Sequence, residues 1–346
     1  MRKSHLLILT YEMDEFSPVY SHQIGVVNNL SNHFDKVTVL TGKLGICQVA
    51  SNVEIYSSNW KAGKRVYSSL ALITIFLKLI ITKRFSVIFS HMTSTHAALI
   101  SPISRALRIK HYLWYTHTSK SKALRLCHFS TNGILTATLG SCPVSGSKIY
   151  VVGHSIDSNL FTKRAELNYP ILNFVHAGRL DPIKRIDYVI NSISIERQKN
   201  PGMTFTQIGM ASSDRYLDYQ NYILNSSKDK SWCAFTNSLK RNELPSKLRE
   251  FDVFIHACDA GLDKSLLEAT FTGLPVLTIN KQYLEIFGSW NLEKKGMNTT
   301  LIEEINGLLS LSKEEIKIEL EKRFQIAQRG FEIRGWASRV AEILKS

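Results

Sequence analysis

The chain has 346 residues, enough for two domains with separate cores, and its composition of 44% hydrophobic and 21% charged residues is ordinary for a globular protein. This balance excludes an intrinsically disordered chain. The five cysteines are scattered and form no Cys-x-x-Cys pair, which argues against a disulfide framework or a zinc site and predicts reduced thiols in a cytosolic protein.

The net charge of +14 is concentrated in the first half of the chain. Residues 1–165 contain 19 of the 43 Lys and Arg residues but only 6 of the 29 Asp and Glu residues, so the rest of the chain is nearly neutral. A basic half predicts a surface that faces an anionic partner. We expect this partner to be anionic membrane lipid; nucleic acid is the competing explanation, and a basic composition without any specific partner stays open.

The first half of the chain alternates between apolar runs typical of strands and helical patterns. Its N-terminal apolar run is too short for a signal peptide and predicts a first strand. The segment 67–83 is apolar, but Lys78 interrupts it and it lacks the roughly 18 clean apolar residues of a membrane span. A buried crossover helix is expected there, with an interfacial helix as the alternative. Strands are expected at residues 4–10, 36–42, 52–58, 85–91, 111–117, 132–138 and 147–157, and helices at 22–34, 67–83 and 95–107.

The periodic patterns are lost near residues 161–169, where we expect a linker between domains of residues 1–164 and 165–329. A second series of strands that alternate with helices follows this linker. Such alternation, with few hairpin signals, predicts doubly wound parallel sheets in an α/β fold. Strands are expected at 171–178, 203–209, 231–237, 252–257 and 275–280, and helices at 185–197, 216–224, 243–249, from 266 onward and over 313–346.

Two strand–turn–helix segments of the second half carry polar residues just after their strands. Arg179 and Lys184 follow one strand, and the other leads into a helix N-terminus at residues 263–266, with Glu268 one turn further in. Turns at the carboxyl edge of a parallel sheet lie side by side. Two cations and a positive helix end suit a diphosphate, and a carboxylate beside them suits ribose hydroxyls. These residues predict a nucleotide-sugar site.

Both segments also carry a family resemblance. Residues 178–184 (GRLDPIK) resemble the Gly-Arg-x4-Lys segment of retaining GT-B glycosyltransferases of the family four type (glycosyl transferases group 1), and residues 266–276 (LLEATFTGLPV) resemble that family's Leu-Glu-Ala-x3-Gly-x-Pro-Val segment. The resemblance implies two Rossmann-like domains that face each other across a cleft, with a helix over about 330–346 packed back on the first. It also implies that Arg179 and Lys184 hold the donor diphosphate and that Glu268 binds its ribose.

One position departs from the family pattern. Ala260 stands where the family usually has a second Glu, and Asp263 and Lys264 replace a loop of small residues, so the donor sugar is expected to be held differently, for instance by Asp263. The bare backbone of Gly261 allows a phosphate to approach closely, and the amides that follow are expected to point at it. The expected donor-binding residues are Arg179, Lys184, Gly261, Leu262, Asp263, Lys264, Ser265 and Glu268.

The first domain contributes fewer candidate residues. His117 matches the position of a histidine that faces the donor sugar in the resembled family, although a hydrogen-bonded loop histidine is the simpler interpretation. We expect His117 to be catalytic together with Arg179 and Lys184, and Ser21 and His22 to contact the acceptor. No Asp-x-Asp pair stands at a strand end, so we expect no metal and no cofactor.

These observations predict a retaining glycosyltransferase that moves a sugar from a UDP- or GDP-sugar to a lipid-linked or polysaccharide acceptor in cell-surface glycan biosynthesis. Such a protein is expected in the cytoplasm, peripherally bound to the inner face of the cell membrane, without a nucleic-acid partner. Three alternatives remain: a GT-B sugar-nucleotide epimerase, a basic nucleic-acid-binding protein, and an inactive relative of the transferases.

Overall fold

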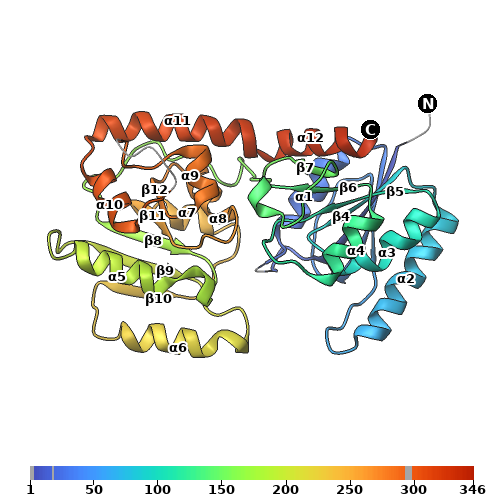
Figure 1. Cartoon of the computed structure of the whole chain (residues 1–346), viewed down its shortest axis with the longest axis horizontal. Coiled ribbons are helices and arrows are strands. Elements are labelled where there is room, and N and C mark those ends of the chain that lie inside the picture. The colour runs from blue at the N-terminus through green and yellow to red at the C-terminus, as the bar shows by residue number, and fades with distance from the viewer. Residues whose placement is uncertain (1–3, 18, 293–297) are drawn as a thin grey trace. The chain divides into compact units, whose positions relative to one another are not determined.

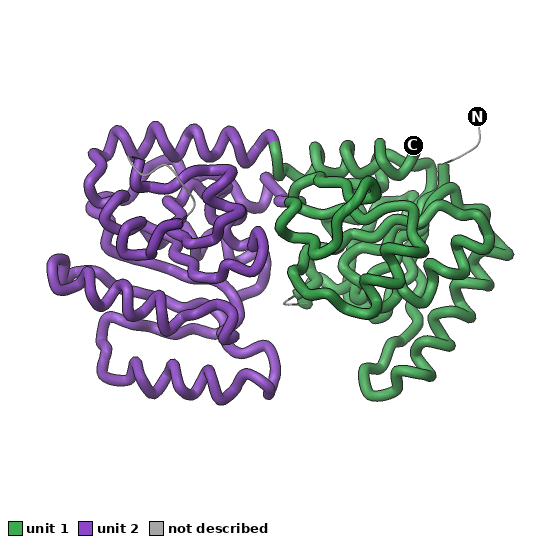
Figure 2. The backbone as a smooth tube through the Cα atoms, in the orientation of Figure 1, with its two compact units in different colours: residues 1–155, 330–346 green, residues 156–329 purple. Residues whose placement is uncertain are grey.

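The computed structural model describes residues 4–17, 19–292 and 298–346, and the chain forms two compact units (Figures 1 and 2). Unit 1 comprises the residues up to Ser155 and returns with Gly330–Ser346, whereas unit 2 comprises Ile156–Arg329. Each unit contains one parallel sheet with helices on both faces. The predicted α/β class is confirmed.

The sheet of unit 1 has seven parallel strands in the order β3-β2-β1-β4-β5-β6-β7. Its central strands are apolar on both faces, as expected for a parallel sheet covered by helices, and Leu6, Leu7, Ile8 and Leu9 of β1 are fully buried. The strands are β1 (His5–Met13), β2 (Lys36–Leu44), β3 (Val53–Ser57), β4 (Val87–His91), β5 (Lys110–Trp114), β6 (Gly133–Thr136) and β7 (Ile149–Val151).

Helices cover the two faces of this sheet in two separate layers. Leu6 and Ile8 share a core with α1 (His22–Ser31) and with α12 (Ile333–Lys345), which belongs to the returning segment. Leu7 and Leu9 point to the other face and pack against α2 (Arg65–Thr82) and α3 (Ser94–Ala106), beside which lies α4 (Lys122–Ser130). Residues 330–346 therefore complete the core of unit 1.

The helix expected at 67–83 is only half buried, so the expectation of a buried crossover helix is wrong for its outer face. Leu72 and Phe76 are fully buried against the sheet, whereas Leu70 and Ile81 are 60% and 84% exposed. Within the described part of the chain, α2 is the one helix that is long and apolar enough to cross a membrane by length and composition alone.

The sheet of unit 2 has five parallel strands in the order β10-β9-β8-β11-β12. The two strands that precede the predicted site, β8 and β11, are direct neighbours in this order, which brings their carboxyl-terminal turns together. The strands are β8 (Asn173–Ala177), β9 (Thr204–Ile208), β10 (Cys233–Thr236), β11 (Val253–His256) and β12 (Val276–Thr278). The helices are α5 (Ile186–Glu196), α6 (Leu217–Ser226), α7 (Leu244–Leu248), α8 (Lys264–Phe271), α9 (Lys281–Phe287), α10 (Leu301–Leu309) and α11 (Lys313–Phe331).

The boundary between the units falls between Ser155 and Ile156, earlier than the predicted boundary at 164. Residues 156–164 belong to unit 2 because their side chains bind there. The guanidinium of Arg164 donates to the carbonyls of Gly273 (3.1 Å) and Phe251 (3.0 Å). The aperiodic stretch is therefore held on unit 2 at Arg164.

Candidate active site

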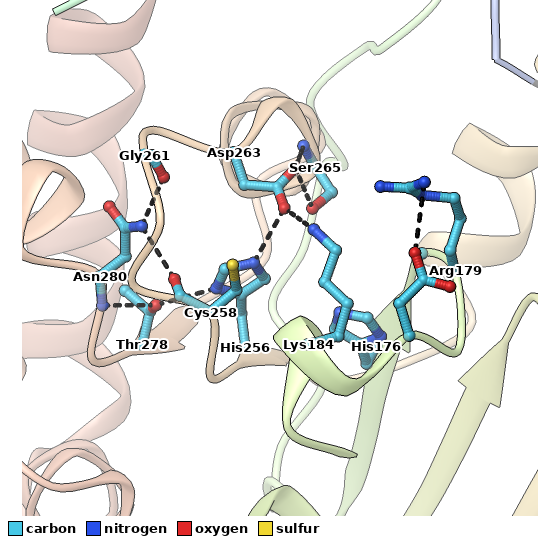
Figure 3. A network of polar contacts seen from close by, with 12 residues as sticks. His176, Arg179, Lys184, His256, Cys258, Gly261, Asp263, Ser265, Thr278 and Asn280 are labelled. Carbon is cyan, nitrogen blue, oxygen red and sulfur yellow. Dashed lines mark hydrogen bonds and ion pairs between the residues drawn. The ribbon is translucent and has the colours of Figure 1, made fainter. Parts of the chain in front are cut away.

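Lys184 is positioned by a tight turn after the central strand β8. Residues Pro182–Lys184 form a short 3-10 turn, and Arg185, with φ 51° in the left-handed region, redirects the chain into α5, which begins at Ile186. The lysine side chain is only 12% exposed and forms an ion pair with the carboxylate of Asp263 (Figure 3). This contact joins the turn after β8 to the turn after β11.

Asp263 is the N-cap residue of α8, and donors surround its carboxylate. Oδ2 accepts from the Lys184 ammonium and from Nε2 of His256 (3.1 Å), while Oδ1 accepts from the amide (3.3 Å) and the hydroxyl (3.2 Å) of Ser265. Burial would raise the pKa of Asp263, but Lys184 and His256 hold this pKa well below its usual range. The Ser265 amide, which we expect to point at a phosphate, donates to Asp263 here as part of the N-cap of α8.

The two cations of the first turn approach the same region. Nη1 of Arg179 lies 3.2 Å from Oδ2 of the buried Asp181 and donates to the Ser212 hydroxyl at 3.4 Å, and the arginine side chain stays 53% exposed. Burial and the charge of Arg179 both lower the pKa of Lys184. Asp263 acts against both and raises this pKa above its usual value. Arg179 and Lys184 are thus neighbouring cations, and each is paired with a carboxylate, Asp181 for Arg179 and Asp263 for Lys184 (Figure 3).

His176 lies beneath this pair with a fixed tautomer. The amide nitrogen of Gln207 donates to the carbonyls of Gly178, Ile208 and Gly209, so its oxygen faces Nδ1 of His176 at 2.8 Å and that nitrogen carries the hydrogen. Burial lowers the pKa of His176 to about 3, which keeps the ring neutral. A Cβ at position 178 would meet this ring at 3.0 Å, which explains the glycine before Arg179.

The turn after β11 is fixed by Asn280, which the sequence patterns did not single out. Its amide nitrogen donates to the carbonyls of Cys258 (2.9 Å) and Gly261 (2.6 Å) (Figure 3). Its oxygen caps α9 by accepting from the Tyr283 amide (3.0 Å). Leu262, within the same turn, is buried. Two backbone contacts by one buried side chain hold the turn that carries Gly261 and Asp263, and a third ties this turn to the start of α9.

Glu268 is buried one turn into α8 and has a partner that no motif indicated. Nη2 of Arg241 lies 2.8 Å from its Oε1, although the N–H bonds do not point at this oxygen, so the contact is an ion pair and not a hydrogen bond. The Arg241 guanidinium lies over the ring of Phe161 at 5.0 Å. Burial, and to a smaller extent the charge of Arg241, lowers the pKa of the nearby Lys264 to about 7. A bound anion would favour the charged form of Lys264.

The three remaining predicted residues belong to unit 1, whereas the cluster around Lys184 belongs to unit 2. His117 lies beyond the end of β5, is exposed, and contacts the Tyr115 ring edge-on at 5.5 Å. Ser21 and His22 stand at the start of α1, where Nε2 of His22 lies 3.1 Å from the sulfur of Met92.

Among the described residues, one group could offer three ligands to a metal: the side chains of His256, Cys258 and Asp263, with ligand atoms within 4.8 Å of one another. Burial raises the pKa of the Cys258 thiol, which disfavours the thiolate that a metal requires. The ammonium of Lys184 already occupies the Asp263 oxygen that would face a metal. This group of side chains therefore suits the Lys184 ammonium better than a metal ion.

Residues 172–310 match the family of glycosyl transferases group 1, which confirms the group 1 part of the resemblance. No curated protein matches the chain in sequence.

Solved structures confirm the GT-B fold across the full length. HepE of Anabaena in complex with UDP and glucose is similar with a TM-score of 0.73 and 15% identity, covering 100% of both chains. Sucrose-phosphate synthase of Thermosynechococcus elongatus is similar with a TM-score of 0.75 and 10% identity, covering 99% of this chain and 98% of that one. The lipopolysaccharide outer core galactosyltransferase WaaB has a TM-score of 0.66 and 10% identity, covering 99% and 100%.

Proposed function

We propose that this chain, whose residues 172–310 match the group 1 glycosyltransferases, transfers a sugar from a UDP- or GDP-sugar with retention of configuration. The observation that carries this proposal is the cluster of Lys184, Asp263 and Arg179 where the turns after β8 and β11 meet. UDP is our first choice of nucleotide because similar structures such as HepE of Anabaena hold UDP and glucose.

We propose that the site acts mainly through positive charge held in a fixed position. In the proposed reaction Lys184 and Arg179 stabilise the negative charge that develops on the leaving diphosphate, as preorganised cations do in phosphoryl chemistry. Asp263 keeps Lys184 charged and in place until the diphosphate arrives. Because the carboxylate of Asp263 is already surrounded by donors, we assign it this positioning role in place of direct sugar binding.

The basic unit 1 is where we place the acceptor. We propose a lipid-linked or polysaccharide acceptor in cell-surface glycan biosynthesis, contacted through Ser21 and His22 of unit 1, with His117 facing the donor sugar. The concentration of positive charge in residues 1–165 supports peripheral binding at the cytoplasmic face of the membrane. No metal or cofactor takes part in this proposal.

The test is a panel of UDP- and GDP-sugars, each offered with and without lipid-linked and polysaccharide acceptors. Acceptor-dependent release of the nucleoside diphosphate, with a retained anomeric configuration in the product, is the expected result. Conversion of the donor to an epimer without acceptor would instead support the epimerase alternative. Tight binding to duplex DNA with a steep salt dependence, without turnover of any donor, would overturn the proposal.

Glu268→Ala tests the proposed ribose contact. Wild-type protein should bind UDP more tightly than its 2′,3′-dideoxy analogue, and the variant should bind both alike, with UDP weakened about tenfold or more because a hydrogen bond to a charged group is lost. Calorimetric titration of both nucleotides separates this effect from general damage, which would weaken both equally. Glu285→Ala, at an exposed position on α9, is the matched control. Persistent discrimination in Glu268→Ala would show that the ribose binds elsewhere.

Asp263→Asn tests whether this residue positions Lys184 or holds the sugar. Asn keeps an N-cap acceptor for α8 but removes the charge that competes for Lys184. We expect the unliganded variant to melt at a lower temperature, because Lys184 loses its buried counter-ion, yet to bind UDP about tenfold more tightly, which corresponds to roughly 1.4 kcal/mol. An unchanged affinity for UDP combined with a lost affinity for UDP-glucose would contradict this and assign Asp263 to the sugar.

A further inference from the structure

The outer face of α2 is apolar and open to solvent. Five large hydrophobic side chains recur there at intervals that place them along one side of the helix. Single exposed hydrophobic residues are ordinary, whereas a continuous strip of them marks an interaction surface. We call this surface the α2 strip; it consists of Val66 (77% exposed), Tyr67 (66%), Leu70 (60%), Leu77 (40%) and Ile81 (84%).

The opposite side of the same helix packs in the core of unit 1. Leu72 and Phe76 are fully buried there and pack with Leu7 and Leu9 of β1. A membrane-spanning position would strip these side chains from the sheet and expose the apolar face of β1. The helix can therefore offer a bilayer only its outer face, which is the arrangement of a helix lying in the plane of the membrane interface.

The charge around α2 is positive apart from Glu54, which forms an ion pair with Lys83 at the C-terminal end of the helix. No Asp or Glu occurs between Glu54 and Asp157, whereas this interval contains thirteen Lys and Arg residues. Several of these are exposed at the ends of α2 and along its length: Lys61, Lys64, Arg65, Lys78 and Arg84. The interval also includes the neighbouring helices α3 and α4 of the same layer (Figure 1). An acid-free layer complements an anionic surface.

We propose that the α2 strip and its flanking cations form the surface by which unit 1 docks on an anionic lipid bilayer. The aliphatic side chains enter the boundary between headgroups and acyl chains, and the cations contact the headgroup phosphates. Nucleic acid would use the cations but has no use for Leu70, Leu77 and Ile81, which can neither stack on bases nor bind phosphates. The inference rests on the proposed function in one respect, since it brings unit 1 to a membrane-bound acceptor.

The test measures binding of the full chain to sedimenting vesicles of phosphatidylglycerol and phosphatidylcholine, without donor or acceptor. The triple variant Leu70→Ser, Leu77→Ser, Ile81→Ser alters only solvent-exposed positions and should lose about tenfold or more in vesicle affinity. Its UDP affinity and melting temperature should match those of wild type, which shows that the fold is intact. A second variant, Lys61→Gln, Lys64→Gln, Arg65→Gln, should weaken binding mainly at low salt.

The matched control is Leu217→Ser with Tyr222→Ser on α6 of unit 2, two positions of similar exposure, which should bind vesicles like wild type. Equal vesicle binding by the α2 triple variant and wild type would overturn the proposal, as would stronger retention on RNA or DNA than on the anionic vesicles. If vesicle binding depends on the α2 strip while no sugar is transferred to any acceptor, the docking surface stands and the proposed function fails.

Discussion

Lys184→Ala should reduce the affinity for UDP by at least about 100-fold, roughly 2.7 kcal/mol, and reduce kcat/KM at least as much. The reason is twofold. The substitution removes a buried cation that would contact the diphosphate, and it leaves the Asp263 carboxylate, normally paired with that cation, facing an anionic ligand. Calorimetric titration with UDP, together with the rate of donor turnover, measures both effects.

Lys281→Ala is the control for this prediction, because Lys281 also stands beside the turn after β11. Its side chain is 56% exposed and forms a loose ion pair, with 4.0 Å between its ammonium and the carboxylate of Asp259. Exposed ion pairs contribute little, so its UDP affinity should change by less than about twofold. Combining Lys184→Ala with Asp263→Asn should recover stability, since no buried charge remains unpaired, without recovering UDP binding. Normal UDP binding by Lys184→Ala would show that the diphosphate does not bind at this cluster.

Trp336→Ala should destabilise unit 1 by about 3–5 kcal/mol. Trp336 is fully buried in the core of unit 1, with its ring 5.4 Å from Trp114 and 5.8 Å from His91. Urea unfolding should show an earlier transition for unit 1. UDP should still stabilise unit 2, because the cluster around Lys184 lies wholly within that unit.

Arg334→Ala provides the comparison, since this side chain lies on the same helix but is exposed, and its unfolding curve should overlay that of wild type. If Trp336→Ala unfolds with wild-type stability, the helix does not contribute to the core as described. If it instead abolishes the UDP response, the two units fold as one cooperative system.

Much of the fold follows from patterns that are local in sequence. Apolar runs that alternate with helical periods predicted two parallel sheets, because each run is long enough for one strand buried on both faces. Arg179, Lys184 and Glu268 could be singled out for a related reason. Each lies just after a strand or early in a helix, and parallel sheets gather such positions at one edge.

The contacts that complete the candidate site could not be predicted in the same way. Arg241 meets Glu268, and Asp263 meets Lys184, across segments far apart in sequence, and Arg241 and Asp263 lie outside both family motifs. Asn280 fixes the turn after β11 through backbone carbonyls, which carry no sequence signal at all. The half-exposed state of α2 was also hidden, because Leu70 and Leu72 are chemically alike and only the packing decides which one is buried.

The return of residues 330–346 to unit 1 has a consequence for biosynthesis. A ribosome makes all of unit 2 after the seven strands of the first sheet and before the helix that carries Trp336. The sheet of unit 1 therefore remains without α12 while unit 2 is synthesised and folds. During this time the face formed by Leu6 and Ile8 is incompletely covered. Premature termination just after Arg329 should yield a chain in which unit 2 is folded and unit 1 is prone to aggregate.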